Sequence, residues 1–250
     1  MQARLLKYEI RNILGNFFIP LFGIIFPIFM GIIIPASVVE EVPKLIRQEV
    51  LNSIILSMSL MIPLCVGFIG YAASYAQENE KQIPLRMKLF GISNKRFIVT
   101  KVLGQFCVIS VTFLVYFVTM HFVHGFTISN FKGMLIFFAF MYLFTAAFLM
   151  ISHAIADLIG KFGPTYGLVM CIYFFLLFIS GSMGMRYEDF PPFLQKIADQ
   201  IPLTPFGQHA YDIWRDKLTN YSSLIQTTIS LLAVGALLLI WSNYKKKQAI

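Results

Sequence analysis

The sequence contains little charge for its length. Only 13% of its 250 residues are Asp, Glu, Lys or Arg, whereas 58% are hydrophobic and the mean hydropathy is +0.74. A typical soluble domain carries about 25% charged residues, so this chain has about half the usual share. Its 26 Phe and 11 Tyr exceed what one core can enclose. The composition excludes an ordinary soluble enzyme and a disordered tail, and it indicates an integral membrane protein.

Cysteine is scarce, and the phosphate-binding loop of nucleotide hydrolases is missing. Cys65, Cys107 and Cys171 fall in three separate apolar runs, where we expect small buried side chains rather than disulfides or metal ligands. The motif Gly-x-x-x-x-Gly-Lys-Ser/Thr does not occur, since Gly160-Lys161 is followed by Phe162. Without this phosphate cradle the chain cannot hydrolyse ATP alone, so we expect no catalytic residue, metal or cofactor in it.

Ionisable side chains are also rare inside the apolar runs. His153, Asp157 and Lys161 follow one another at intervals of four near one end of the fourth run. We interpret them as a ladder of polar side chains at the membrane interface; the alternative is a proton relay. No acid occupies the middle of a run, which argues against a proton- or sodium-driven carrier.

What the sequence does contain is six uncharged runs, each long enough to cross a bilayer once as a helix. A hydrocarbon core of about 30 Å needs roughly 20 apolar residues. The sequence therefore predicts an all-α membrane protein, a single transmembrane domain over residues 1–250. The predicted helices cover 16–36, 53–75, 102–122, 134–156, 164–184 and 223–242.

The basic residues orient these spans. Of the 20 Lys and Arg, 13 fall at the termini and in the even-numbered connections, while eight of the 12 acids fall on the other side. The positive-inside rule then places the N- and C-termini in the cytoplasm. We interpret the net charge of +8 as this orientation signal and expect no nucleic-acid partner.

Three segments outside the spans carry further signals. Residues 1–15 predict an amphipathic helix lying in the membrane interface, with one apolar stripe formed by Leu5, Leu6, Ile10, Ile13 and Leu14. Residues 77–101 form a long cytoplasmic connection, in which Pro84 can begin a short helix, Gly91 can end it and Ser93 can cap the next. This connection is interpreted either as a basic lipid-binding loop or as a docking element. Residues 186–222, rich in proline and aromatic residues, predict an external cap or re-entrant segment.

The connection from Glu78 to Lys101 resembles the loop between spans two and three of the ABC-2 type permease family. It has two acids, a short basic and hydrophobic helix, Gly-Ile-Ser and a basic pair, and the six spans and the external segment fit the same type V exporter-like architecture. In that family the loop is the coupling helix, which receives motion from a separate ATPase. The resemblance implies coupling roles for six residues: Glu78, Glu80, Arg86, Lys88, Leu89 and Phe90.

The resemblance implies the membrane subunit of an ATP-driven exporter in a bacterial plasma membrane. We expect a second permease chain, identical or related, membrane lipids, and a cytoplasmic ATPase that binds ATP and Mg²⁺. The apolar spans favour an amphiphilic cargo such as a drug, a peptide antibiotic or a lipid-linked molecule. The alternative is a membrane immunity or sensor protein that binds a partner within the bilayer and needs no ATPase.

Overall fold

The computed structural model describes residues 2–17, 19–39, 42–180 and 190–248, and regular structure in these residues is helical throughout. Six helices among them are long and apolar enough to cross a membrane. They are Pro20–Val38, Arg47–Glu80, Asn94–His124, Phe131–Ile159, Phe162–Ile179 and Ser222–Lys245. The predicted all-α fold with six membrane spans is confirmed, and spans two, three and four extend two to eight residues further at each end than predicted.

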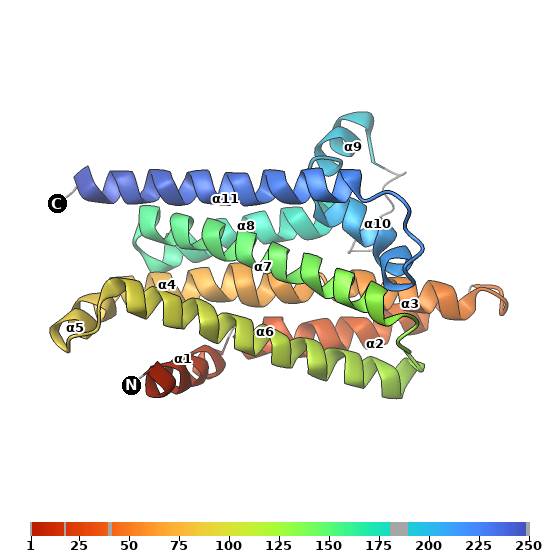
Figure 1. Ribbon diagram of the computed structural model, residues 1–250, viewed down its shortest axis with the longest axis horizontal. Helices are drawn as coiled ribbons and strands as arrows, with labels where there is room; N and C mark the ends of the chain where they lie inside the picture. The colour runs from red at the N-terminus through yellow and green to blue at the C-terminus, as the bar shows by residue number, and fades with distance from the viewer. Residues whose placement is uncertain (1, 18, 40–41, 181–189, 249–250) are drawn as a thin grey trace.

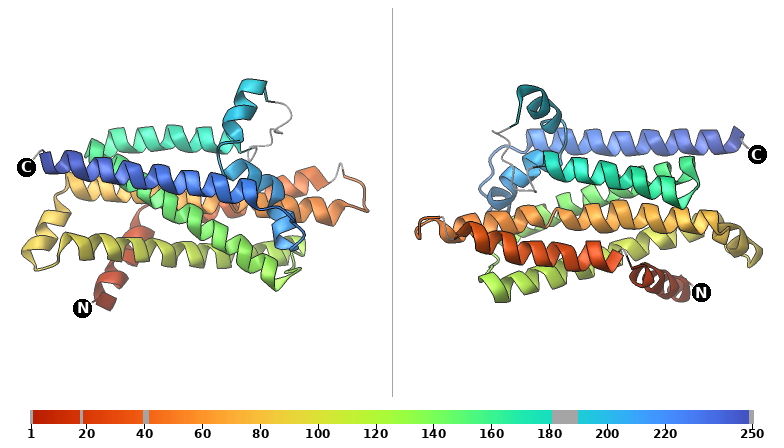
Figure 2. Two further views of the ribbon diagram at one scale, coloured as in Figure 1. Left: turned by 45° about the horizontal axis from the view of Figure 1, so that its top comes forward. Right: turned by 180° about the vertical axis from the view of Figure 1, so that it is seen from behind.

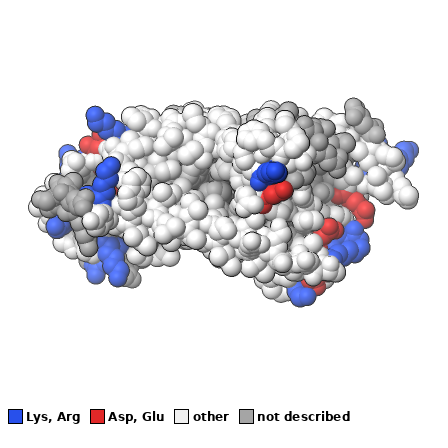
Figure 3. Space-filling model, turned by 90° about the horizontal axis from the view of Figure 1, so that it is seen from above, with Lys and Arg blue, Asp and Glu red and all other residues white. Residues whose placement is uncertain are grey.

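These six helices lie along the long axis of the molecule, with both termini at one end (Figure 1). The short helix α5 (Ile83–Leu89) lies at that same end, which we call the basic end; the connections at the other end include α9 (Pro192–Ala198) and α10 (Leu203–Trp214). Lys, Arg, Asp and Glu gather toward both ends of the face in Figure 3 and leave a largely uncharged stretch between them. This distribution suits a bundle that crosses a bilayer.

The second span is the central helix of the bundle. It consists of α3 (Arg47–Met58), η2 (Pro63–Gly70) and α4 (Tyr71–Glu80). In its most apolar stretch 83% of residues are buried, compared with 22% in the first and last spans. The helices α6 (Asn94–His124), α7 (Phe131–Ile159) and α8 (Phe162–Ile179) pack around it, while α11 (Ser222–Gln248) packs mainly on α7. Residues of the second span are therefore placed to couple several neighbouring helices.

Two prolines change the helical winding without ending the helix. The π-helical segments η1 (Pro20–Ile25) and η2 both begin at a proline, and η1 leads directly into α2 (Phe26–Val39). Proline lacks an N–H and crowds the carbonyl one turn earlier, and a wider π-turn accommodates both effects. The sequence predicts bends or ends at these prolines; the structure has wider turns within continuous spans.

At the end opposite the basic end, α10 inserts aromatic side chains between the spans. Phe206 and Trp214 are buried, and the Phe206 ring meets the Phe144 ring edge-on at a centroid distance of 5.1 Å. Gly133, in the first turn of α7, allows the backbone of α10 to approach, because a Cβ there would overlap the carbonyl oxygens of Ile213 and Trp214. These helices occupy the predicted cap segment, of which residues 186–189 lie outside the described part of the chain.

The amphipathic helix α1 (Gln2–Gly15) lies across the basic end of the bundle rather than along it (Figure 2, left). It packs on α6 through Leu5, Glu9 and Ile13, which follow one another at intervals of four and are all buried. The side chains of Leu6, Ile10 and Leu14 lie on another face. The sequence assigns all five of the apolar residues to one stripe, whereas the structure divides them between two faces.

Some side chains are more exposed than the sequence predicts. Cys65 is buried as expected, but the prediction was wrong for Cys107 and Cys171, which lie on the outer surface of their helices. Gly163 and Gly167 of α8 also face outward within this chain, because a Cβ at either position would meet nothing within 4 Å. Periodicity does not distinguish a helix face toward the bundle from one toward lipid when both are apolar.

Candidate coupling site at the basic end

Local residues determine where the helix α5 begins and where it ends. Gln82 adopts a left-handed conformation with φ of 57°, and Pro84 follows in the first turn. At the other end Gly91 has φ of 78°, and the Ile92 N–H donates to the Met87 carbonyl at 3.0 Å. This is the Schellman arrangement, which satisfies carbonyls that would otherwise remain unpaired. Glycine is favoured at this position because a Cβ is strained at positive φ.

One side of α5 packs on the bundle and the other is exposed. Ile83 and Met87 pack against a buried cluster formed by Tyr71, Tyr75, Ala76, Phe97, Leu149 and Ala156. On the outer side Leu89 is 82% exposed and Phe90 79% exposed. The basic side chains of Arg86 and Lys88 are exposed beside them in the last helical turn. The outer side is thus an apolar surface with a basic border at the end of the molecule.

Glu78 and Glu80, the two acids among the predicted coupling residues, lie in different environments. Glu80 is exposed, and its Oε2 accepts a hydrogen bond of 3.0 Å from the backbone N–H of Phe162, the first residue of α8. A carboxylate at a helix N-terminus satisfies a free N–H and opposes the positive end of the helix dipole. Glu78 is instead buried, inside an ion cluster. The structure therefore divides the six predicted coupling residues among the α5 surface, the start of α8 and the interior.

The ion cluster centres on Lys101 of α6, which is completely buried. Its Nζ lies 2.5 Å from Glu9 Oε1 and 3.0 Å from Glu78 Oε1, and 3.5 Å from Ser74 Oγ. Asn12 of α1 donates to Glu78 Oε1 at 2.7 Å. One lysine and two glutamates thus join three helices that are distant in sequence, α1, α4 and α6. Buried ion pairs contribute little net stability, but removing one partner leaves a costly unpaired charge.

A cavity of about 350 Å³ borders this cluster. Tyr8, Asn12, Asn16 and Glu78 are among its lining residues. Partial burial and the negative charges of Glu78 and Glu9 raise the pKa of the Tyr8 hydroxyl above its ordinary value. No donor from the described residues reaches the buried Glu78 Oε2. The cavity has the size and polarity to hold ordered water near this oxygen.

A second polar cluster joins α4 to α7. The Tyr71 hydroxyl is 2.8 Å from His153 Nδ1, the Tyr75 hydroxyl donates to Asp157 Oδ1 at 3.0 Å, and His153 Nε2 lies 3.8 Å from Asp157 Oδ2. The chain turns at Gly160, with φ of 70°, before it reaches Lys161, which is exposed at the start of α8. Two of the three predicted ladder residues therefore meet, and the third lies beyond the end of α7.

Sequence reasoning missed the role of Glu9 and Lys101 as buried partners. The sequence did contain a signal for the burial of Glu9, because this residue lies between Leu5 and Ile13 on one helical stripe. A lone acid on an apolar stripe needs a counter-charge. The tyrosines Tyr71 and Tyr75 carried no comparable signal. In the described residues no group of three or more His, Cys, Asp or Glu is arranged to hold a metal ion.

A family model described as ABC-2 family transporter protein matches residues 47–244. This match covers spans two to six, the α5 connection and the α9–α10 segment. The chain belongs to the ABC-2 transporter family. No curated protein matches the sequence. The ABC-2 permease is the transmembrane part of a transporter, and such permeases generally work with an ABC ATPase subunit. The chain is accordingly a multi-pass membrane transporter component, and α1 and the first span precede the matched residues.

Proposed function

We propose that this ABC-2 permease chain is the membrane subunit of an ATP-driven exporter in a bacterial plasma membrane, with its basic end in the cytoplasm. A separate ATPase, which binds ATP and Mg²⁺, docks on the outer side of α5. The observation that carries the proposal is the pair Leu89 and Phe90, each about four-fifths exposed at the basic end of the bundle. Large apolar side chains held outward beyond the spans indicate a protein-binding surface.

The ion cluster gives a route from this surface into the spans. The helix α5 joins α4 to α6, and Lys101 binds both of these helices to α1 through Glu78 and Glu9. Glu80 links the end of α4 to α8, and Asp157 links α4 to α7. A displacement of α5 on ATP binding by the partner would therefore reach five helices through charged or hydrogen-bonded contacts.

An apolar groove supports an amphiphilic cargo. It has a volume of about 810 Å³ and lies between α6 and α7 near the end opposite the basic end, with Trp214 of α10 at its border. Most of its lining is aromatic or aliphatic. Polar atoms are few; the hydroxyls of Ser110 and Tyr142, 2.6 Å apart, are one such pair. An apolar site with few polar groups suits a molecule with a large hydrophobic part and a small polar part.

A second permease chain would complete the transport path for the cargo. The outer side of α8 is a surface against which the second chain could pack. The inner side of α8 presents Thr165, Val169 and Tyr173 to the bundle, all buried. Gly163, Gly167 and Cys171 lie on the opposite side, with open space at both glycines. Small residues at intervals of four allow close contact between membrane helices. We propose that α8 of one permease meets a helix of the second there.

The test is co-purification with an ABC ATPase subunit from the same host, co-expressed with this chain. The double variant Leu89→Asp/Phe90→Asp places two charges on the docking surface and should reduce recovery of the ATPase at least tenfold. The matched control is Leu45→Asp/Ile46→Asp, an exposed apolar pair beyond the other end of the bundle, which should leave recovery unchanged.

Equal recovery with the α5 variant and the control would refute docking at α5. If no ATPase co-purifies even with the unaltered chain, the alternative of an immunity or sensor protein would be favoured. Stimulation of the ATPase activity of the complex by one class of amphiphile would identify the cargo class.

A further inference from the structure

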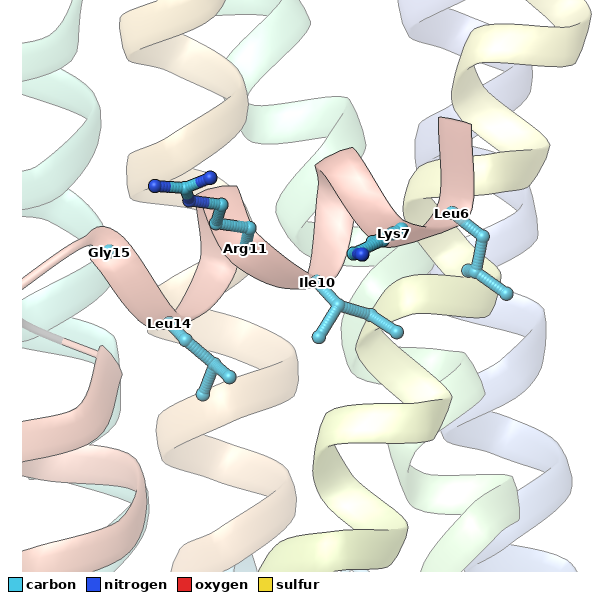
Figure 4. Close-up of a pocket in the computed structure, with 6 residues that line it drawn as sticks. All are labelled: Leu6, Lys7, Ile10, Arg11, Leu14 and Gly15. Carbon is cyan, nitrogen blue, oxygen red and sulfur yellow. The ribbon is translucent and has the colours of Figure 1, made fainter. Parts of the chain in front are cut away.

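The outward side of α1 forms a niche lined by both apolar and basic side chains. Leu6, Ile10 and Leu14 line a volume of about 590 Å³ together with Lys7, Arg11 and Gly15. In Figure 4 the side chains of Leu6, Ile10 and Leu14 point to one side of the helix, while Arg11 points the opposite way. The helix thus separates an apolar environment from a polar one, as expected at a membrane interface.

The exposed charge on α1 is of one sign. Arg4, Lys7 and Arg11 are exposed, whereas Glu9, the sole acid of the helix, is buried against Lys101. Glu9, the acid that could offset this basic charge, is buried in the interior. The niche is therefore complementary to an amphiphile with a negatively charged head.

The position of the niche favours a lipid over a protein. A protein partner docked on α5 would approach α1 on the side where Arg4 and Tyr8 form a cavity with Met87 and Ile92. The niche lies on a different face of α1, the one that carries Leu6, Ile10 and Leu14. This face is at the depth where phospholipid headgroups meet acyl chains when α1 lies in the interface plane.

We propose that this niche binds an anionic phospholipid of the cytoplasmic leaflet, with its phosphate against Lys7 and Arg11 and an acyl chain against Leu6, Ile10 and Leu14. The proposal uses the membrane orientation given under the proposed function, but it requires neither the ATPase nor a cargo. Since Glu9 ties α1 to α4 and α6, a bound lipid would also hold the helix that adjoins the coupling connection.

The experiment measures lipid binding by the purified full chain alone. Titration with short-chain phosphatidylglycerol and phosphatidylcholine, followed by native mass spectrometry, should show preferential retention of phosphatidylglycerol. The variant Lys7→Gln/Arg11→Gln should weaken phosphatidylglycerol binding about 30-fold, from the contribution of two basic residues near an anionic surface. Its matched control, Lys44→Gln/Lys217→Gln, removes two exposed charges at the end opposite the basic end and should retain most of the affinity.

Two results would overturn the proposal. One is equal retention of the two lipids with no effect of Lys7→Gln/Arg11→Gln. The other is unchanged lipid binding in that variant together with lost ATPase recovery, which would assign this face to the protein partner. If the double variant aggregates, salt titration of the unaltered chain decides, because phosphatidylglycerol retention must fall as ionic strength rises. Failure of ATPase docking at α5 would leave the lipid result unaffected.

Discussion

At the scale of single residues, the contact between α1, α4 and α6 at the basic end depends on one lysine, Lys101. Lys101 is fully buried between Glu9 and Glu78, and its ammonium also lies 5.9 Å from the centre of the Tyr71 ring. Two carboxylates and one ammonium leave the cluster with a net negative charge if all three are ionised. Loss of the lysine would therefore leave two buried acids facing each other without a counter-charge.

We predict that Lys101→Met destabilises the protein by about 3–5 kcal/mol, the usual cost of breaking a buried ion pair from one side. Thermal unfolding of the purified chain in detergent would measure the loss. The triple variant Lys101→Met/Glu9→Gln/Glu78→Gln removes all of the charge and should recover most of the stability. Lys245→Met, at the exposed end of α11, is the control and should change little.

An unchanged melting temperature for Lys101→Met would show that the cluster does not hold α1 on the bundle. A triple variant no more stable than Lys101→Met would indicate that the ammonium acts through packing on Tyr71 and Phe97 rather than through the carboxylates.

Single residues also show where sequence reasoning succeeds. Gly91 and Ser93 have the predicted roles: the glycine has positive φ after α5, and the serine side chain accepts a hydrogen bond from the Arg96 N–H. Both roles depend on local chain geometry, which neighbouring residues determine. The partnership of Glu9 with Lys101 spans 92 positions, and no local pattern identifies which charge meets which.

At the scale of elements, the contact between α7 and α10 depends on the absence of a side chain. Gly133→Ala would place a Cβ against the carbonyl oxygens of Ile213 and Trp214, and these backbone atoms cannot move without displacing α10. We predict a loss of about 1–3 kcal/mol, the range for overpacking in a close contact. Thermal unfolding of the purified chain in detergent is the measurement.

The control for this change is Gly167→Ala. A Cβ at Gly167 would meet nothing within 4 Å, and alanine favours a helix more than glycine does. Its melting temperature should stay equal or rise. Equal melting temperatures for the two variants would mean that α10 does not pack against the start of α7 as described.

The number and approximate position of the membrane-spanning helices could be predicted from the sequence. Their local winding and the direction in which each face points could not. Six long uncharged runs can be read directly from the sequence because a bilayer imposes their length. The π-turns at Pro20 and Pro63 were not predicted, since a proline signals only that the regular winding must change. The orientation of each helix was also out of reach. In a uniformly apolar span, such as the one that carries Cys171, the sequence does not show which side faces neighbouring helices.

At the scale of the whole molecule, the outer side of α8 is the surface that we propose a second permease chain covers. Gly163, Gly167 and Cys171 lie in line along it, opposite the buried face that begins with Thr165 and Val169. In a membrane there is little hydrophobic gain from covering such a surface, so close packing at small residues is the main driving force.

We predict that oxidation of membranes with copper phenanthroline links two chains through Cys171. The test uses a Cys107→Ser background, in which the remaining Cys65 is buried and therefore shielded from the oxidant. The product should migrate at about twice the mass of the 28.5 kDa chain and disappear on reduction. Gly167→Leu should prevent it, because a large side chain one turn away would hold the paired helices beyond the 7 Å that a disulfide tolerates between Cα atoms.

A chain that retains exposed Cys107 but carries Cys171→Ser is the control for random collision. If both single-cysteine surfaces cross-link equally, the proposed contact between two permease chains at α8 is wrong.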